Sequence, residues 1–125
     1  MNAPNTRVLI ADDNVALATV VAERFESHGL SSVVCSDGDQ AWDLFRASSI
    51  SVIVSDFDMP GISGTELCRR VHSLSPQLPF FIMTAREVEL QSDPKLRDLK
   101  VARIFPKPFR FAELLASVKK SILNP

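Results

Sequence analysis

Short runs of apolar residues, many of them β-branched, recur five times along this 125-residue chain, and each is followed by polar or turn-forming residues. Runs of this length predict buried β-strands. We expect strands at Arg7–Ala11, Ser31–Cys35, Ile50–Ser55, Phe80–Met83 and Ala102–Pro106. Proline cannot donate a hydrogen bond to a neighbouring strand, so the proline in the last run predicts that this strand lies at an edge of the sheet.

Between the strands, apolar residues recur at steps of three and four, which predicts amphipathic helices. Asn14 can cap the first helix and Ser36 or Asp37 the second, while Ser63 with Glu66 matches a capping box for the third. Each helix then has one face that must be buried. These faces comprise Leu17, Val20, Val21, Phe25 and His28 in the first helix, Ala41, Leu44 and Phe45 in the second, Leu67, Val71 and Leu74 in the third, and Phe111, Leu114, Leu115, Val118 and Ile122 in the last.

The segment between the fourth and fifth strands allows two interpretations. A helix that begins at Glu87 would be broken by Pro94. With Ser92 or Asp93 as its cap and Pro94 at its first position, a shorter helix can instead run through Leu99. We favour the shorter helix, which is the fourth of five.

Strand and helix thus alternate five times, which predicts an α/β fold with one five-stranded parallel sheet and five helices on its two faces. The length suits one domain over residues 1–125, with a core from about residue 7 to residue 123. Cys35 and Cys68 lack the spacing of a metal site or a redox pair, so we interpret both as small buried hydrophobic residues.

Composition narrows the choice of partners. The formal net charge is −1, from 14 basic and 15 acidic side chains, and it favours neither direct binding of nucleic acid nor attachment to an anionic membrane. No apolar segment is long enough to cross a bilayer, and the N-terminus lacks a signal-peptide pattern. We therefore expect a cytoplasmic protein whose partners must be identified from its sites.

Polar side chains that could carry chemistry follow four of the five predicted strands. Asp12 and Asp13 follow the first strand, Asp56 the third, Thr84 the fourth and Lys107 the fifth. The carboxyl ends of parallel strands meet at one edge of the sheet, where open α/β folds bind their ligands. Each residue alone has an ordinary explanation as a turn former, a strand residue or a surface charge. Together, and in this order, they predict a functional site.

The residue types at this edge indicate phosphoryl chemistry. Neighbouring carboxylates repel one another unless a cation shares the site, and oxygen ligands without histidine or thiolate favour Mg²⁺. Asp56 can then act as a nucleophile that takes a phosphoryl group as an acyl phosphate. The Thr84 hydroxyl and the Lys107 ammonium group could stabilise the charge on the transferred group.

With these motifs, the chain resembles the receiver domains of two-component response regulators from Val8 to Ile122. The motifs are Asp12-Asp13, Asp56 with Met59-Pro60 and Gly64, Thr84-Ala85, and Lys107-Pro108-Phe109. The resemblance implies a flavodoxin-like sheet of strand order 2-1-3-4-5. It also implies that Asp56 accepts a phosphoryl group from a histidine kinase or a histidine phosphotransfer protein, and that the protein then acts on a downstream effector.

The resemblance assigns roles to individual residues as well. Asp12, Asp13, Asp56 and the backbone carbonyl of Asp58 would bind Mg²⁺, while Thr84 and Lys107 would contact the phosphoryl oxygens. The Lys107–Pro108 peptide bond is expected to be cis. Such a protein catalyses only its own phosphorylation and dephosphorylation, and is not an enzyme for an outside substrate.

The chain departs from the usual receiver pattern at one of the two switch residues, which in receivers change position on phosphorylation. The first, Thr84, is present. The second, three residues before Lys107, is commonly an aromatic residue in receivers, but here it is Ile104. Phe105 has the wrong alternation to replace it. Output is then expected to use the loop after Thr84 and the fourth helix. The oligomeric state stays open, because the fourth helix is unusual here.

Asp58 and Arg86, two residues beyond Asp56 and Thr84, match positions that flank the site in receivers and influence how fast water reaches the acyl phosphate. Because they carry opposite charges, they could pair across the site, where even a loose ion pair could slow the access of water. A surface pair of this kind contributes only about 0 to 1 kcal/mol. The alternative is that the two charges are unconnected.

Two other functions compete with the phosphorylation switch. A phosphorylation-independent interaction module would have no need for the complete set of site residues. A small phosphohydrolase could use Asp56 as nucleophile with Asp58 as general acid, but such an enzyme needs a cap over its substrate, for which 125 residues leave no room.

Overall fold

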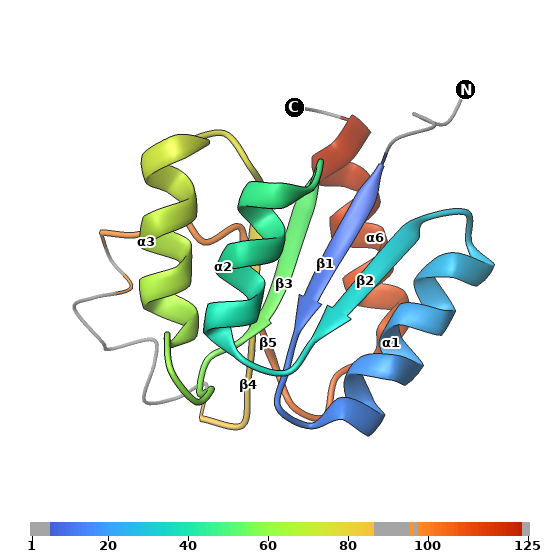
Figure 1. Ribbon diagram of the computed structural model, residues 1–125. Helices are drawn as coiled ribbons and strands as arrows, with labels where there is room; N and C mark the ends of the chain where they lie inside the picture. The colour runs from blue at the N-terminus through green and yellow to red at the C-terminus, as the bar shows by residue number, and fades with distance from the viewer. Residues whose placement is uncertain (1–5, 87–95, 97, 124–125) are drawn as a thin grey trace.

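The computed structural model describes residues 6–86, 96 and 98–123, and its centre is a five-stranded sheet (Figure 1). All neighbouring strands are parallel, in the order β2-β1-β3-β4-β5, as predicted. The strands are β1 (Arg7–Ala11), β2 (Ser31–Cys35), β3 (Val52–Asp56), β4 (Phe80–Thr84) and β5 (Arg103–Pro106). The strand that contains proline, β5, lies at an edge of the sheet, as predicted.

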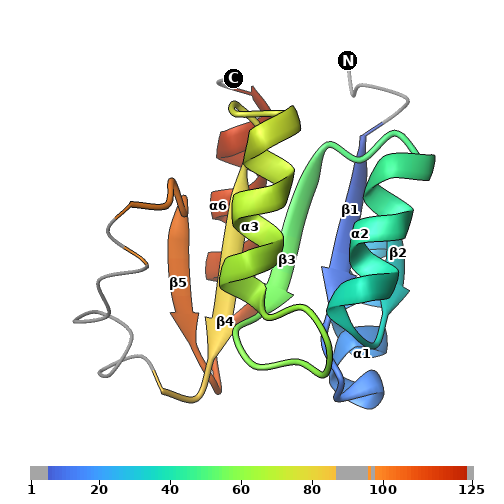
Figure 2. The same cartoon turned by 60° about the vertical axis from the view of Figure 1, so that its left-hand side comes forward.

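Helices cover both faces of this sheet, and four of them lie in the described residues. They are α1 (Val15–Ser27), α2 (Gly38–Ala47), α3 (Gly64–Leu74) and α6 (Phe111–Leu123). Figures 1 and 2 show α2 and α3 on one face and α1 and α6 on the other. The remaining predicted helix, the fourth in chain order, from Pro94 to Leu99, falls largely outside the described residues. Within its described part, the backbone N–H of Leu99 donates to the carbonyl of Leu96.

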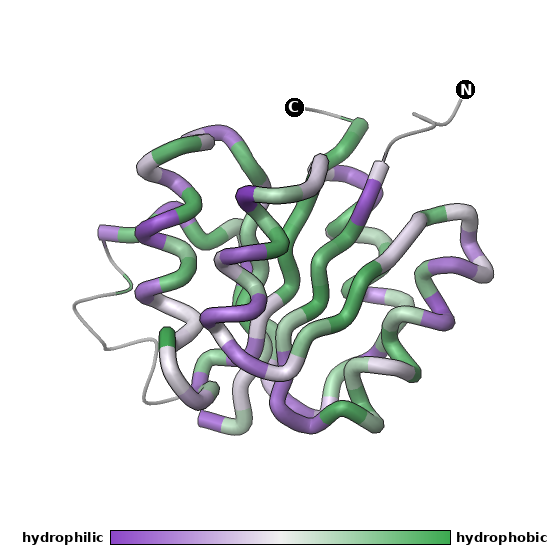
Figure 3. Tube along the Cα trace, in the orientation of Figure 1, coloured by the Kyte–Doolittle hydropathy of each residue, from purple (hydrophilic) through white to green (hydrophobic). Residues whose placement is uncertain are grey.

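Two hydrophobic cores result from the alternation of side chains along the strands. In β1, Val8 and Ile10 pack with α1 and α6, whereas Leu9 and Ala11 pack with α2 and α3. Figure 3 shows the predominantly hydrophobic strands between helices with polar outer faces. None of the helices in the described part of the chain is long and apolar enough to cross a membrane.

Several predicted boundaries differ from the structure. β3 and β4 extend one residue further than predicted, to Asp56 and Thr84, because both residues are in register with a neighbouring strand. Backbone pairing does not depend on the polarity of the side chain. The predicted starts of β3 and β5 were early by two residues and one residue, respectively.

Three side chains predicted on buried helix faces are exposed: Val20 and Leu74 are 52% and 61% exposed, and His28 caps the end of α1. The buried residues of α1 are instead Ala18, Val21, Ala22 and Phe25. This narrower stripe contains two alanines, which allow the helix to pack closely on the sheet.

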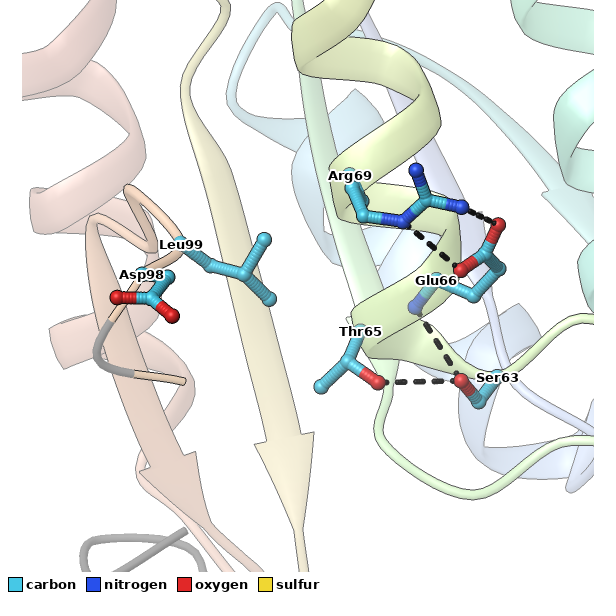
Figure 4. Close-up of a pocket in the computed structure, with 6 residues that line it drawn as sticks. All are labelled: Ser63, Thr65, Glu66, Arg69, Asp98 and Leu99. Atoms are coloured by element: carbon cyan, nitrogen blue, oxygen red, sulfur yellow. Dashed lines mark hydrogen bonds and ion pairs between the residues drawn. The ribbon is translucent and has the colours of Figure 1, made fainter. Parts of the chain in front are cut away.

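The helix caps agree with the prediction in part. Asn14 caps α1 and Asp37, not Ser36, caps α2. The Ser63 hydroxyl accepts a hydrogen bond from the backbone N–H of Glu66, as a capping box requires. Figure 4 shows that the Glu66 carboxylate turns instead to Arg69, and it also pairs with Arg70.

Candidate functional site

The ends of four strands bring the predicted site residues together at one edge of the sheet. Asp12 and Asp13 directly follow β1, Asp56 and Thr84 are the last residues of β3 and β4, and Lys107 directly follows β5. Hydrogen bonds fix these ends, from Asp12 N–H to the Cys35 carbonyl and from Lys107 N–H to the Thr84 carbonyl. Residues that are far apart in the sequence therefore form one cluster, as the strand order requires.

Lys107 is the central cation of this cluster. Its Nζ lies 2.8 Å from Asp12 Oδ2 and 3.4 Å from Asp56 Oδ1. Burial alone would lower the pKa of Lys107, but the hydrogen bond and the charge of Asp12, together with Asp56, raise it above its usual value. Lys107 therefore carries a full positive charge. Asp12 itself is completely buried, and its second oxygen accepts from the backbone N–H of Asn14.

Asp56 lies in an environment with excess negative charge. Burial and the charge of Asp12 raise the pKa of its carboxyl group to about 6, and Lys107 opposes this shift only in part. Carboxylate oxygens of Asp12, Asp13 and Asp56 lie within 4.8 Å of one another. A second cation would relieve this repulsion, and three hard oxygen donors match the ligand preference of Mg²⁺. The residues present therefore fit a magnesium ion.

Thr84, the last residue of β4, lies at the side of the site next to β5. Its side chain is almost completely buried, and its hydroxyl oxygen accepts a hydrogen bond from the backbone N–H of Arg86. This contact orients the hydroxyl group and ties it to the first residues of the following loop. A movement of the Thr84 side chain would therefore also shift the backbone of Arg86.

Asp58 and Arg86 form an ion pair, and are therefore not two unconnected charges. Arg86 Nη2 lies 3.0 Å from Asp58 Oδ1 and Arg86 Nε lies 3.1 Å from Asp58 Oδ2, so the contact is bidentate. The guanidinium group also lies over the ring of Phe57, 5.1 Å from its centroid. The pair thus connects the loop after β3 with the loop after β4, beside Asp56.

The two residues at the switch position point to opposite faces of the sheet. Ile104 is half-buried and packs with the core under α2 and α3, whereas Phe105 belongs to the core under α1 and α6. The ring of Phe105 lies against those of Phe81 and Phe109. The alternation predicted for Phe105 is confirmed. The Lys107–Pro108 bond is cis, as the resemblance implies.

Several contacts that position the site have no counterpart in a sequence pattern. The ion pair between Lys107 and Asp12 joins residues 95 positions apart, and no local pattern signals it. The completely buried Ser55 donates its hydroxyl hydrogen to the backbone carbonyl of Asp56. A Cβ atom at Gly64 would lie 2.4 Å from that same carbonyl oxygen, so only glycine fits at the start of α3.

Comparison with proteins of known sequence supports this picture. The Mycolicibacterium vanbaalenii protein named response regulator MprA is 32% identical over 113 residues, which cover 90% of this chain and 48% of that protein. MprA of Mycobacterium bovis is 30% identical over 115 residues, with 92% and 50% covered. The chain thus spans about half the length of these curated relatives.

Solved structures and a family model agree. The Francisella response regulator 1452 receiver domain superposes with a TM-score of 0.85 at 28% identity, covering 95% of this chain and 98% of that one. Response regulator protein TrrA of Thermotoga maritima, solved in complex with Mg(2+)-BeF, gives a TM-score of 0.83 at 25% identity, with 93% and 98% covered. The family model for the response regulator receiver domain matches residues 8–119, and the chain belongs to this family.

Proposed function

We propose that Asp56 is the phosphoacceptor of this receiver domain in a two-component or phosphorelay pathway. The observation that carries the proposal is the position of the Asp56 carboxylate, which lies 3.4 Å from the Lys107 ammonium group and within 4.8 Å of carboxylate oxygens of Asp12 and Asp13. With a pKa of about 6, Asp56 is mostly ionised at neutral pH, which a nucleophile requires. The phosphodonor is a histidine kinase or a histidine phosphotransfer protein.

In the proposed reaction, an Asp56 carboxylate oxygen attacks the phosphorus of a phosphohistidine. The new oxygen–phosphorus bond forms as the phosphorus–nitrogen bond breaks, and the electron pair stays with the imidazole. Lys107 and the Thr84 hydroxyl hold the phosphoryl oxygens, where they offset negative charge in the transition state. Asp12, Asp13, Asp56 and the backbone carbonyl of Asp58 would hold Mg²⁺, which supplies further positive charge at those oxygens when bound.

Phosphorylation then alters the surface that a downstream effector recognises. A phosphoryl group adds about −1.5 to −2 charges beside Thr84 and Lys107. Thr84 is linked to the following loop through its hydrogen bond with the backbone of Arg86. Because Ile104 replaces the usual aromatic ring, we propose that this loop transmits the change.

The test is to incubate the protein with acetyl phosphate and Mg²⁺ and to measure its intact mass. We expect one added phosphoryl group in the wild type and none in Asp56→Asn or after chelation of the metal. A wild type that gains no mass would support a phosphorylation-independent module instead. Continuous turnover of acetyl phosphate without a detectable phosphoprotein would indicate a phosphohydrolase, although Arg86 holds the Asp58 carboxylate that would have to act as its general acid.

The ion pair between Asp58 and Arg86 is expected to lengthen the life of the phosphoprotein. Arg86→Ala and Asp58→Asn each remove this ion pair and should speed autodephosphorylation by about two- to fivefold. This range corresponds to the free energy that an exposed ion pair usually contributes. The rate is measured by the loss of the phosphoprotein mass after removal of the donor. Arg46→Ala is the matched control, because it breaks a comparable surface pair with Asp43 on α2. Unchanged rates in both site variants would show that the pair does not protect the acyl phosphate.

A further inference from the structure

The first turn of α2 packs against the loop that follows Asp56, and Figure 2 shows this loop reaching the start of α2. Gly38, the first residue of α2, donates its backbone N–H to the Pro60 carbonyl at 3.4 Å. A Cβ atom at Gly38 would lie 1.9 Å from the Ile62 carbonyl oxygen and 2.7 Å from its carbonyl carbon. Both of these atoms are backbone, so a side chain at this position would have to displace the loop itself.

Asp39 makes a second close contact with the same loop. A Cβ atom at Gly61 would lie 2.0 Å from Asp39 Oδ2, so the Asp39 carboxylate occupies the space that a side chain at Gly61 would need. Gly61 also has a φ of +75°, a conformation that favours glycine. Helix and loop therefore approach each other closely at two places, with a glycine on each side.

Other contacts hold the loop at its ends, at Asp58 through its pair with Arg86, and at Ile62 through its burial in the core under α2 and α3. Its first residue, Phe57, donates its N–H to the Met83 carbonyl, and its own carbonyl accepts from the N–H of Gly64. These bonds fix where the loop leaves β3 and enters α3. Pro60, Gly61 and Ile62 lie between them, and the backbone of α2 contacts the loop there.

We propose that Gly38 and Asp39 are positioning residues for the metal site, which they support from α2 without being ligands themselves. The contact with residues 60–62 sets the path of the loop and hence the position of the Asp58 carbonyl, a proposed Mg²⁺ ligand. This inference rests on the proposed function. Groups that orient metal ligands commonly change metal affinity about 10- to 100-fold when they are altered.

The first test compares Gly38→Ala with Gly29→Ala in the full chain. Gly29 has a φ of +82° in the turn between α1 and β2, so alanine there also costs stability but leaves the loop untouched. By calorimetric titration, Gly38→Ala should bind Mg²⁺ about tenfold more weakly than the wild type, and Gly29→Ala within about twofold. In metal-free protein, amide hydrogen exchange at residues 58–63 should accelerate only in Gly38→Ala. Equal Mg²⁺ affinities for the two alanine variants would overturn the proposal.

Variants of Asp39 supply a second test that adds no bulk. Asp39→Asn removes the charge but keeps the volume that contacts Gly61, whereas Asp39→Ala removes both. We expect Asp39→Ala to bind Mg²⁺ more weakly than Asp39→Asn. Equal affinities would mean that Asp39 acts only through its charge, which contradicts a positioning role. A wild type that binds Mg²⁺ but takes no phosphoryl group from acetyl phosphate would refute the proposed function and leave this comparison valid.

Discussion

Lys107→Met is expected to slow the phosphorylation of Asp56 by acetyl phosphate about 10²- to 10³-fold, the usual cost of removing one preorganised group that stabilises charge in a transition state. Lys107 Nζ lies 3.4 Å from the proposed nucleophile and is held there by Asp12 at 2.8 Å. Methionine keeps an unbranched side chain that is only one heavy atom shorter, but it carries no charge. The rate is measured as the gain of phosphoprotein mass with time at saturating Mg²⁺.

The same variant should change how the rate depends on pH. Lys107 lowers the pKa of Asp56, so its removal raises that pKa further and moves the acidic limb of the pH–rate profile to higher pH. Lys119→Met, on the exposed side of α6, is the matched control and should retain the wild-type rate and profile. A wild-type rate in a folded Lys107→Met protein would remove Lys107 from the proposed mechanism.

The architecture was predictable because apolar runs and polar breaks alternate so regularly. Each of the five strands buries side chains on at least one face, so its hydrophobic run marks its position even without partners. The ends of the runs were less certain. Asp56 and Thr84 belong to the ladder although their side chains are polar, because the backbone of a neighbouring strand continues beside them.

The sequence indicated a contact between distant segments only where opposite charges or the family resemblance pointed to it. The pair of Asp58 and Arg86 could be proposed because both residues match positions that flank the site in receivers and because they carry opposite charges. The contact of Gly38 with Ile62 could not, since nothing in either segment indicates how closely a helix and a loop will approach. The exposure of Val20 and Leu74 likewise depends on where the helices meet the sheet.

The like charges that lie close together in the site lower the stability of the folded protein. Asp12 and Asp56 are buried beside the Lys107 ammonium group, and with Asp13 they bring three carboxylates within 4.8 Å of one another. Functional sites commonly retain such unfavourable arrangements, which the remainder of the fold must offset. For Asp56, the unfavourable interaction appears as a pKa raised to about 6.

Asp56→Asn is therefore expected to stabilise the metal-free protein by about 1 to 3 kcal/mol at pH 7.5, at roughly 1.4 kcal/mol for each pKa unit. The pKa of Asp56 is higher in the folded state than in the unfolded chain. Between about pH 4 and pH 6, the folded state therefore binds more protons than the unfolded chain does. The Asp56 contribution to wild-type stability thus falls as pH rises through that window. The advantage of Asp56→Asn should be near zero below about pH 4 and complete above about pH 6.

Urea unfolding at several pH values, followed by the fluorescence of Trp42 on α2, measures this difference. Asp43→Asn is the control, since Asp43 is an exposed carboxylate on the same helix as the reporter. Added Mg²⁺ should shrink the advantage of Asp56→Asn, because a cation bound at the three carboxylates stabilises the wild-type folded state by mass action. An advantage that is the same at all pH values and Mg²⁺ concentrations would mean that electrostatic repulsion at Asp56 is not its source.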